Sequence, residues 1–70
     1  MGHPRGEVLF EFLQIGDTVK VSAVDARTNT EVSLVGSARA SRAALQQAAL
    51  QKLRYVIGKA EAEKRAKSGH

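Results

Sequence analysis

The 70-residue sequence contains no cysteine, and its two histidines, His3 and His70, lie close to the ends. Without thiols, neither a disulfide framework nor a thiolate metal site can form. An imidazole near a chain end is poorly placed to act as a general base or to activate a serine. These absences predict a protein without enzymatic activity, cofactor or metal ion.

Long apolar segments are also missing. The apolar runs extend over a few residues, whereas a helix that spans a bilayer needs about 20. The first ten residues, MGHPRGEVLF, include no apolar stretch of signal-peptide length. Together with the lack of cysteine, which fits a reducing compartment, this predicts a cytoplasmic protein that does not contact membranes. A chain of 70 residues allows one small domain at most.

Acidic residues are few, and their positions do not favour acid–base chemistry. Asp17 and Asp25 fall in predicted turns at opposite ends of one strand, too far apart to act as a pair. Residues 36–41, GSARAS, include one glycine and no Lys-Ser or Lys-Thr pair, so they do not form a phosphate-binding loop. An anion bound at a helix start beside Ser41 and Arg42 stays an unspecific alternative.

Charge is distributed unevenly along the chain. Residues 1–35 carry three basic and five acidic side chains, whereas residues 36–70 carry eight basic and two acidic ones. The favoured interpretation is a solvated helix rich in Lys and Arg, with cations near its C-terminus. The alternative is a polyanion-binding surface. Its candidate residues are Arg39, Arg42, Lys52, Arg54 and Lys59.

The longest periodic segment, residues 41–60, predicts one amphipathic helix. At 3.6 residues per turn its apolar side chains fall on one stripe: Leu45, Ala49, Leu50, Leu53, Val56, Ile57 and Ala60. Ser41 is the expected N-cap, and Ser37 is an alternative start. Beyond Ala60 the helix has nothing apolar left to bury, although Ala and Lys propensity favours its continuation. Tyr55, near Lys52 and Lys59, is expected to be partly buried, or alternatively to contact a partner.

Three strands precede this helix, at residues 7–15, 18–24 and 30–35. Gly16-Asp17 predicts a two-residue hairpin turn, and the polar loop after Asp25 contains Asn29, which suits a left-handed conformation. The order predicts an α+β fold, a three-stranded antiparallel meander with one long C-terminal helix packed on one face. We expect a disordered leader at residues 1–6, a single domain at 7–66 and a frayed tail at 67–70. The expected core from the strands comprises Phe10, Phe12, Val19, Val21, Val32 and Leu34.

A single helix covers only one face of a sheet, and the other face would still carry apolar side chains. These are Leu9, Leu13, Ile15, Val24 and Val35. Such a patch on a small protein favours an interface, most commonly a symmetric homodimer. The alternative is that the sheet twists and these residues close the ends of the core. We therefore expect a protein-interaction or self-association module whose partner is protein, its own copy or another chain.

Three strand segments, GEVLFEF (6–12), VKVSAVD (19–25) and TEVSLVG (30–36), carry a resemblance to a known family. With the helix residues Ser41, Ala44, Leu45, Leu50, Lys52, Leu53, Tyr55 and Val56, the chain resembles a small bacterial family described as a domain of unknown function. The similarity spans about residues 6–59. It implies a stand-alone cytoplasmic protein with no established activity, and it assigns no site residues.

A helix that begins Ser41-Arg42 and continues to Ala48, Ala49 and Leu50 is similar to the C-terminal part of a double-stranded RNA-binding domain. That family places basic side chains of the helix start across duplex phosphates and senses shape more than sequence. The family's first helix has no counterpart here, and two of its helix-start lysines fall on Ala43 and Gln46. Arg42 and Arg39 remain, which implies weak, salt-sensitive binding to nucleic acid as the alternative function.

Overall fold

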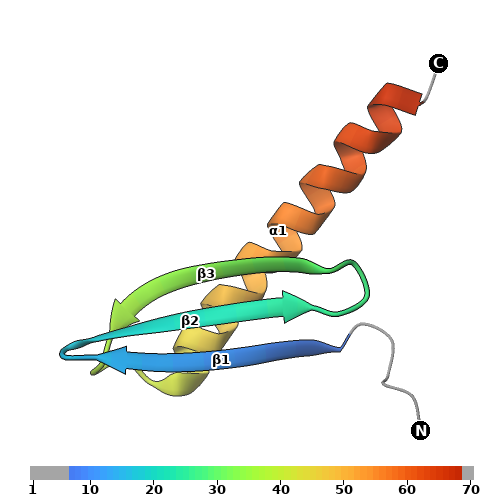
Figure 1. Ribbon diagram of the computed structural model, residues 1–70. Helices are drawn as coiled ribbons and strands as arrows, with labels where there is room; N and C mark the ends of the chain where they lie inside the picture. The colour runs from blue at the N-terminus through green and yellow to red at the C-terminus, as the bar shows by residue number, and fades with distance from the viewer. Residues whose placement is uncertain (1–6, 69–70) are drawn as a thin grey trace, which may run out of the picture.

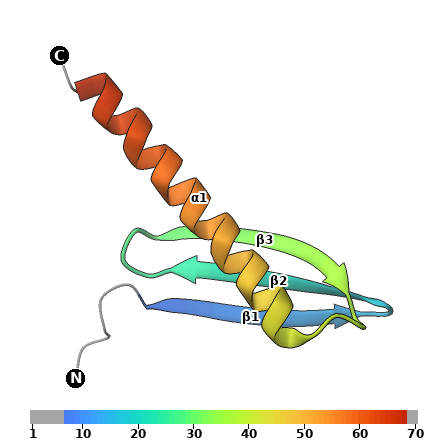
Figure 2. The same cartoon turned by 180° about the vertical axis from the view of Figure 1, so that it is seen from behind.

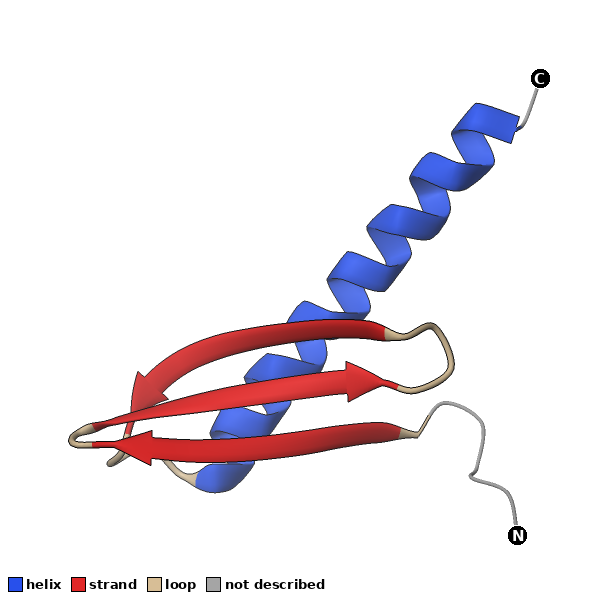
Figure 3. Ribbon diagram, in the orientation of Figure 1, coloured by secondary structure: helices blue, strands red, loops and turns tan. Residues whose placement is uncertain are grey.

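A computed structural model describes residues 7–68, and the expected leader at residues 1–6 lies outside them. Strands β1 (Val8–Ile15), β2 (Thr18–Asp25) and β3 (Thr30–Ser37) precede the helix α1 (Arg42–Ser68). The strands form one antiparallel sheet in the order β1-β2-β3, with α1 on one side of it (Figures 1 and 3). The predicted β-β-β-α architecture is confirmed. The helix includes residues 67 and 68, which the sequence assigned to the frayed tail.

Two tight connections fix the register of the sheet. Gly16 lies between the paired residues Ile15 and Thr18 and has a φ of 61°. It occupies the first central position of a type II′ turn, where a side chain would add a steric cost that glycine avoids. In the second connection Asn29 has a φ of 56°, as predicted. The Asp25 carboxylate there accepts a hydrogen bond of 2.9 Å from the Arg27 amide. All eight residues of each strand therefore pair in continuous register.

Strand β3 is longer than the sequence predicted. The expected end at Val35 is wrong because Gly36 and Ser37 still pair with Val19 and Thr18 of β2. Gly36 lies directly under the helix, where a Cβ would collide with the Cδ2 atom of Leu45. The missing side chain thus allows the first turns of α1 to approach the sheet.

The core lies between α1 and the centre of the sheet. Its buried apolar residues are Val21, Ala23, Val32, Leu45, Ala49 and Leu53. The helix crosses the sheet diagonally and packs mainly on β2 and β3 (Figure 2). Phe10 and Phe12 on β1, expected in the core, are therefore only half-buried, as are Val19 and Leu34. At the far end of the predicted stripe, Ala60 is exposed.

Ser41 is the N-cap of α1. Its hydroxyl accepts a hydrogen bond of 3.0 Å from the Ala44 amide, and its carbonyl accepts the first helical bond from Leu45 at 3.1 Å. The Ser37 hydroxyl instead accepts from the Arg39 amide at 3.0 Å, in the connection before the helix. These bonds decide between the two predicted starts in favour of Ser41.

The C-terminal part of α1 projects beyond the sheet (Figures 1 and 2). Its 27 residues correspond to a length of about 40 Å at 1.5 Å per residue. Residues 58–66 are exposed throughout, since charged residues and alanine replace the apolar stripe. The molecule is consequently elongated and measures 50 × 31 × 16 Å along its principal axes.

We expect Gly36→Val to destabilise the protein by about 1–3 kcal/mol, although valine favours strands, because the new side chain occupies the space of Leu45. Chemical denaturation measures the change in the free energy of unfolding. In a double-mutant cycle, Leu45→Ala should lower the free energy of unfolding by less in the Gly36→Val variant than in the unmodified protein. Strict additivity would contradict the predicted collision.

Replacement of the N-cap by Ser41→Ala should lower the free energy of unfolding by about 1 kcal/mol, because the Ala44 amide loses its acceptor. Ser37→Ala is the matched control and should cost less, since that hydroxyl does not cap the helix. Thermal denaturation followed by circular dichroism compares the two variants. A larger loss of stability from Ser37→Ala than from Ser41→Ala would contradict the assignment of Ser41 as the N-cap.

Candidate interaction surface

The side of the sheet that faces away from α1, here called the open face, is built by alternate residues of all three strands. The register aligns them in four rows: Leu9–Val24–Glu31, Glu11–Ser22–Ser33, Leu13–Lys20–Val35 and Ile15–Thr18–Ser37. Every residue of the predicted interface belongs to these rows. The hairpin turn and the strand pairing therefore bring together apolar side chains that are far apart in sequence.

Four of the predicted interface residues are highly exposed. The exposed fraction is 53% for Leu9, 54% for Leu13, 64% for Ile15 and 68% for Val35, whereas Val24 is half-buried. The alternative that these residues close the ends of the core does not apply to the four exposed ones, since none of them packs against the core cluster.

Polar side chains cross the middle of the open face. Glu11, Ser22 and Ser33 form one row, and Lys20 stands between Leu13 and Val35 in the next. A shallow hollow of about 160 Å³ lies among Glu11, Phe12, Leu13, Lys20 and Ser22. The open face thus has one acidic group, Glu11, and one basic group, Lys20, near its centre. Its end rows mix apolar side chains with Glu31, Thr18 and Ser37.

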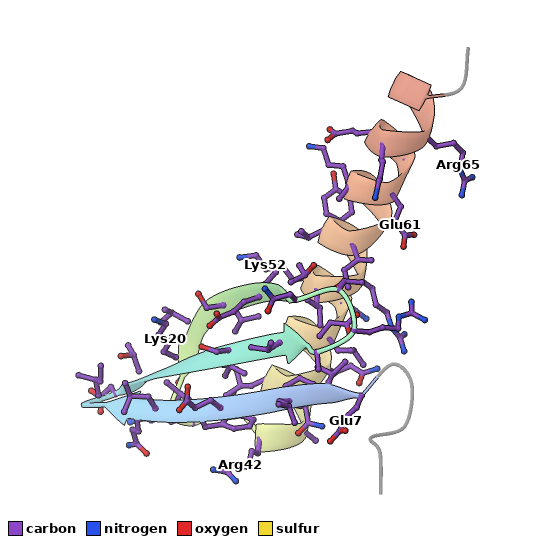
Figure 4. The ribbon with its side chains drawn as sticks, turned by 45° about the vertical axis from the view of Figure 1, so that its right-hand side comes forward. Glu7, Lys20, Arg42, Lys52, Glu61 and Arg65 are labelled. Atoms are coloured by element: carbon purple, nitrogen blue, oxygen red, sulfur yellow. The ribbon has the colours of Figure 1, made fainter. Side chains whose placement is uncertain are left out.

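The two outer edges of the sheet differ. At β3 the Lys52 ammonium donates a hydrogen bond of 2.8 Å to the Ser33 carbonyl. Near β1 the Arg42 guanidinium lies over the ring of Phe12, with its Cζ 4.5 Å from the ring centroid, a cation–π geometry. In Figure 4 Arg42 and Lys52 lie toward opposite edges of the sheet.

The predicted polyanion-binding residues therefore do not converge on one site. Arg42 contacts β1 and Lys52 contacts β3, while Arg39, Arg54 and Lys59 are exposed. Lys52 and Lys59 are seven residues apart, so they lie on one side of α1, and Arg54 lies on another.

Tyr55 is 68% exposed, so the prediction of a partly buried tyrosine is wrong. Its position on the helix turns the ring away from the sheet, between Lys52 and Lys59. The ring and the two lysines form an exposed strip along α1. The sequence placed these three residues together but did not indicate that the ring is free of the core.

A further hollow of about 270 Å³ lies at the start of α1, and the sequence did not predict it. It is lined by Phe12, Gln14, Val19, Ala38, Ala40, Arg42 and Leu45. The Ala38 amide donates a bond of 2.8 Å to the Asp17 carbonyl, which holds the connection before α1 against the first hairpin turn. No local motif signals this hollow because it depends on a contact between two separate turns.

Among residues 7–68, no three His, Asp or Glu side chains lie together in a way that could hold a metal ion. In the same part of the chain, no helix combines the length and apolarity that crossing a membrane requires.

Comparison with known families matches residues 5–60 to a domain of unknown function, DUF6898. The chain belongs to this family. Searches of curated proteins and of solved structures found no match. The DUF6898 match covers the sheet and the part of α1 that packs on the core, which extends to Ile57. The family assigns no activity, so inferences about function rest on the surfaces described above.

Proposed function

We propose that this DUF6898 chain acts by binding rather than by catalysis, as a self-association module whose partner is a second copy. The observation that carries the proposal is the open face, with four large apolar side chains more than half exposed. Burial of one such side chain contributes about 1.5–3 kcal/mol. Several large apolar side chains exposed on one face, with polar groups among them, suit a protein interface.

The charges of the open face favour one arrangement of the two copies. A two-fold axis between the sheets and perpendicular to the strands places Leu9 of one copy opposite Ile15 of the second copy. The same axis brings Lys20 of the second copy beside Glu11. A two-fold axis parallel to the strands instead stacks the two Lys20 side chains, which repel each other. We therefore expect aligned sheets about 10 Å apart, with Glu11–Lys20 pairs across the interface.

The test is the molecular mass in solution, by light scattering over a concentration series. We expect a reversible dimer that Val35→Asp weakens at least tenfold, because the substitution removes apolar contact area and the new carboxylate must lose its hydration at the interface. Val35 lies on β3, so this change leaves the outer edge of β1 intact. Tyr55→Asp is the matched control, since Tyr55 is equally exposed but lies on the helix, and it should leave the dimer unchanged.

Circular dichroism should show an unchanged fold for both variants. A chain that is monomeric at every concentration, or an equal effect of both substitutions, would overturn association through the open face.

Nucleic-acid binding is a second candidate, favoured by the exposed strip of Lys52, Tyr55 and Lys59. An exposed ring between cations suits stacking on a base with nearby phosphate contacts. The resemblance to double-stranded RNA-binding domains uses Arg42 instead.

If the strip binds nucleic acid, Lys59→Gln should weaken binding and reduce the slope of log affinity against log salt by about 1. Arg42→Gln should leave both the affinity and this slope unchanged. Titration of duplex and single-stranded RNA at several salt concentrations measures these slopes. The reverse order of effects would favour the helix-start mode. No binding at low salt would eliminate both modes.

A further inference from the structure

We infer that the outer edge of β1 pairs in antiparallel fashion with β1 of a second copy, which creates a continuous six-stranded sheet. This edge is distinct from the open face, so the inference does not depend on the proposed function. It rests on three observations: an unsatisfied backbone edge, apolar side chains that α1 leaves partly uncovered, and a register that separates the two Glu11 carboxylates.

The first observation is the contrast between the two edges. Lys52 hydrogen-bonds the Ser33 carbonyl at the outer side of β3, and a lysine at an edge discourages further strand pairing. Within the described residues 7–68, β1 pairs with β2 alone, and no group hydrogen-bonds the outer backbone edge of Val8–Ile15. In an antiparallel sheet, residue pairs that exchange hydrogen bonds alternate with pairs whose backbone groups point away from each other. Because the Ser33 carbonyl points outward from β3, this alternation places the amides of Phe10 and Phe12 on the outer edge of β1.

The sequence of β1 also lacks the usual protection of an edge strand. Its eight residues, VLFEFLQI, include no proline, lysine or arginine, and they pair with β2 without a bulge. Glu11 is the one charged residue in the strand. Long, regular and apolar edges of this kind are templates for pairing with another strand.

The inner side of β1 carries two aromatic side chains that pack against the core, and Arg42 lies over one of them, Phe12. Since α1 packs mainly on β2 and β3, Phe10 and Phe12 stay half-buried. A second β1 would bring its own phenylalanines beside them and extend the apolar layer under the helix start. Strand β1 is itself apolar and regular over eight residues, so a second copy offers an edge of matching length and character.

The position of Glu11 selects the register. Pairing centred on Glu11 places two carboxylates directly opposite, which is unfavourable. Pairing centred on Phe12 places each Glu11 opposite Leu13 of the other copy and aligns Leu9 with Ile15. Pairing centred on Phe10 also avoids the repulsion, but it uses a shorter part of the strand. We therefore expect the two-fold axis at Phe12.

The natural absence of cysteine allows a direct test by disulfide trapping. In the register centred on Phe12, Glu11 and Leu13 form a pair without mutual hydrogen bonds, with Cα atoms about 4.5 Å apart, within the range of a disulfide. An equimolar mixture of Glu11→Cys and Leu13→Cys chains, oxidised under native conditions, should give mainly the mixed dimer, identified by mass. Sheets stacked through their open faces lie about 10 Å apart and cannot form this bond.

A Lys20→Cys chain mixed with the Leu13→Cys chain is the control, since Lys20 is exposed on the central strand and cannot reach a neighbouring edge. It should give no preference for the mixed product. A statistical distribution of products from the Glu11 and Leu13 mixture, or equal trapping in the control, would overturn the inference.

Chemical synthesis of the chain with an N-methylated Phe12 amide provides an independent measurement. This change removes one outward donor and blocks approach of the second strand, so it should abolish trapping while circular dichroism stays unchanged. The same modification at Val35, on the outer edge of β3, should leave trapping intact. Equal trapping with and without the Phe12 modification would also overturn edge pairing. If Val35→Asp leaves association unchanged while disulfide trapping at β1 succeeds, only the proposed association through the open face is overturned.

Discussion

The packing of one helix on the centre of a three-stranded sheet is the interaction on which the rest of this structure depends. Leu45, Ala49 and Leu53 of α1 meet Val21, Ala23 and Val32 of β2 and β3, and these six residues are the buried apolar core. A domain of this size buries a modest share of its surface, so few contacts determine the fold. The close approach of Leu45 to Gly36 sets how near the helix lies to the sheet.

The same packing determines what is left uncovered. A single helix covers one face, so the open face keeps Leu9, Leu13, Ile15 and Val35 in contact with solvent. Because the helix crosses diagonally toward β3, Lys52 bonds one carbonyl at the edge of β3, whereas nothing within residues 7–68 hydrogen-bonds the outer edge of β1. Membership of the DUF6898 family supplies no activity, so the proposals about function rest on these two uncovered surfaces.

Basic charge is spread around the molecule rather than gathered on one site. Arg42 lies over Phe12 near β1 and Lys52 bonds the Ser33 carbonyl at β3, so these two cations do not share one surface. The exposed strip with Tyr55 offers few contacts to a polyanion, and few contacts imply weak, salt-dependent binding. For this reason the apolar surfaces carry the stronger functional argument.

The sequence by itself determined the order of elements, the hairpin turn at Gly16, the N-cap at Ser41 and which side chains share a face of the sheet. These features depend on local backbone preferences and on the periods of strands and helices, which sequence patterns record. Only the tertiary structure decided the crossing direction of α1, and with it the partial burial of Phe12, the exposure of Tyr55 and the difference between the edges. The crossing direction depends on contacts between segments that are distant in sequence, such as Leu45 and Leu53 with Val21 and Val32, and no local pattern encodes such contacts.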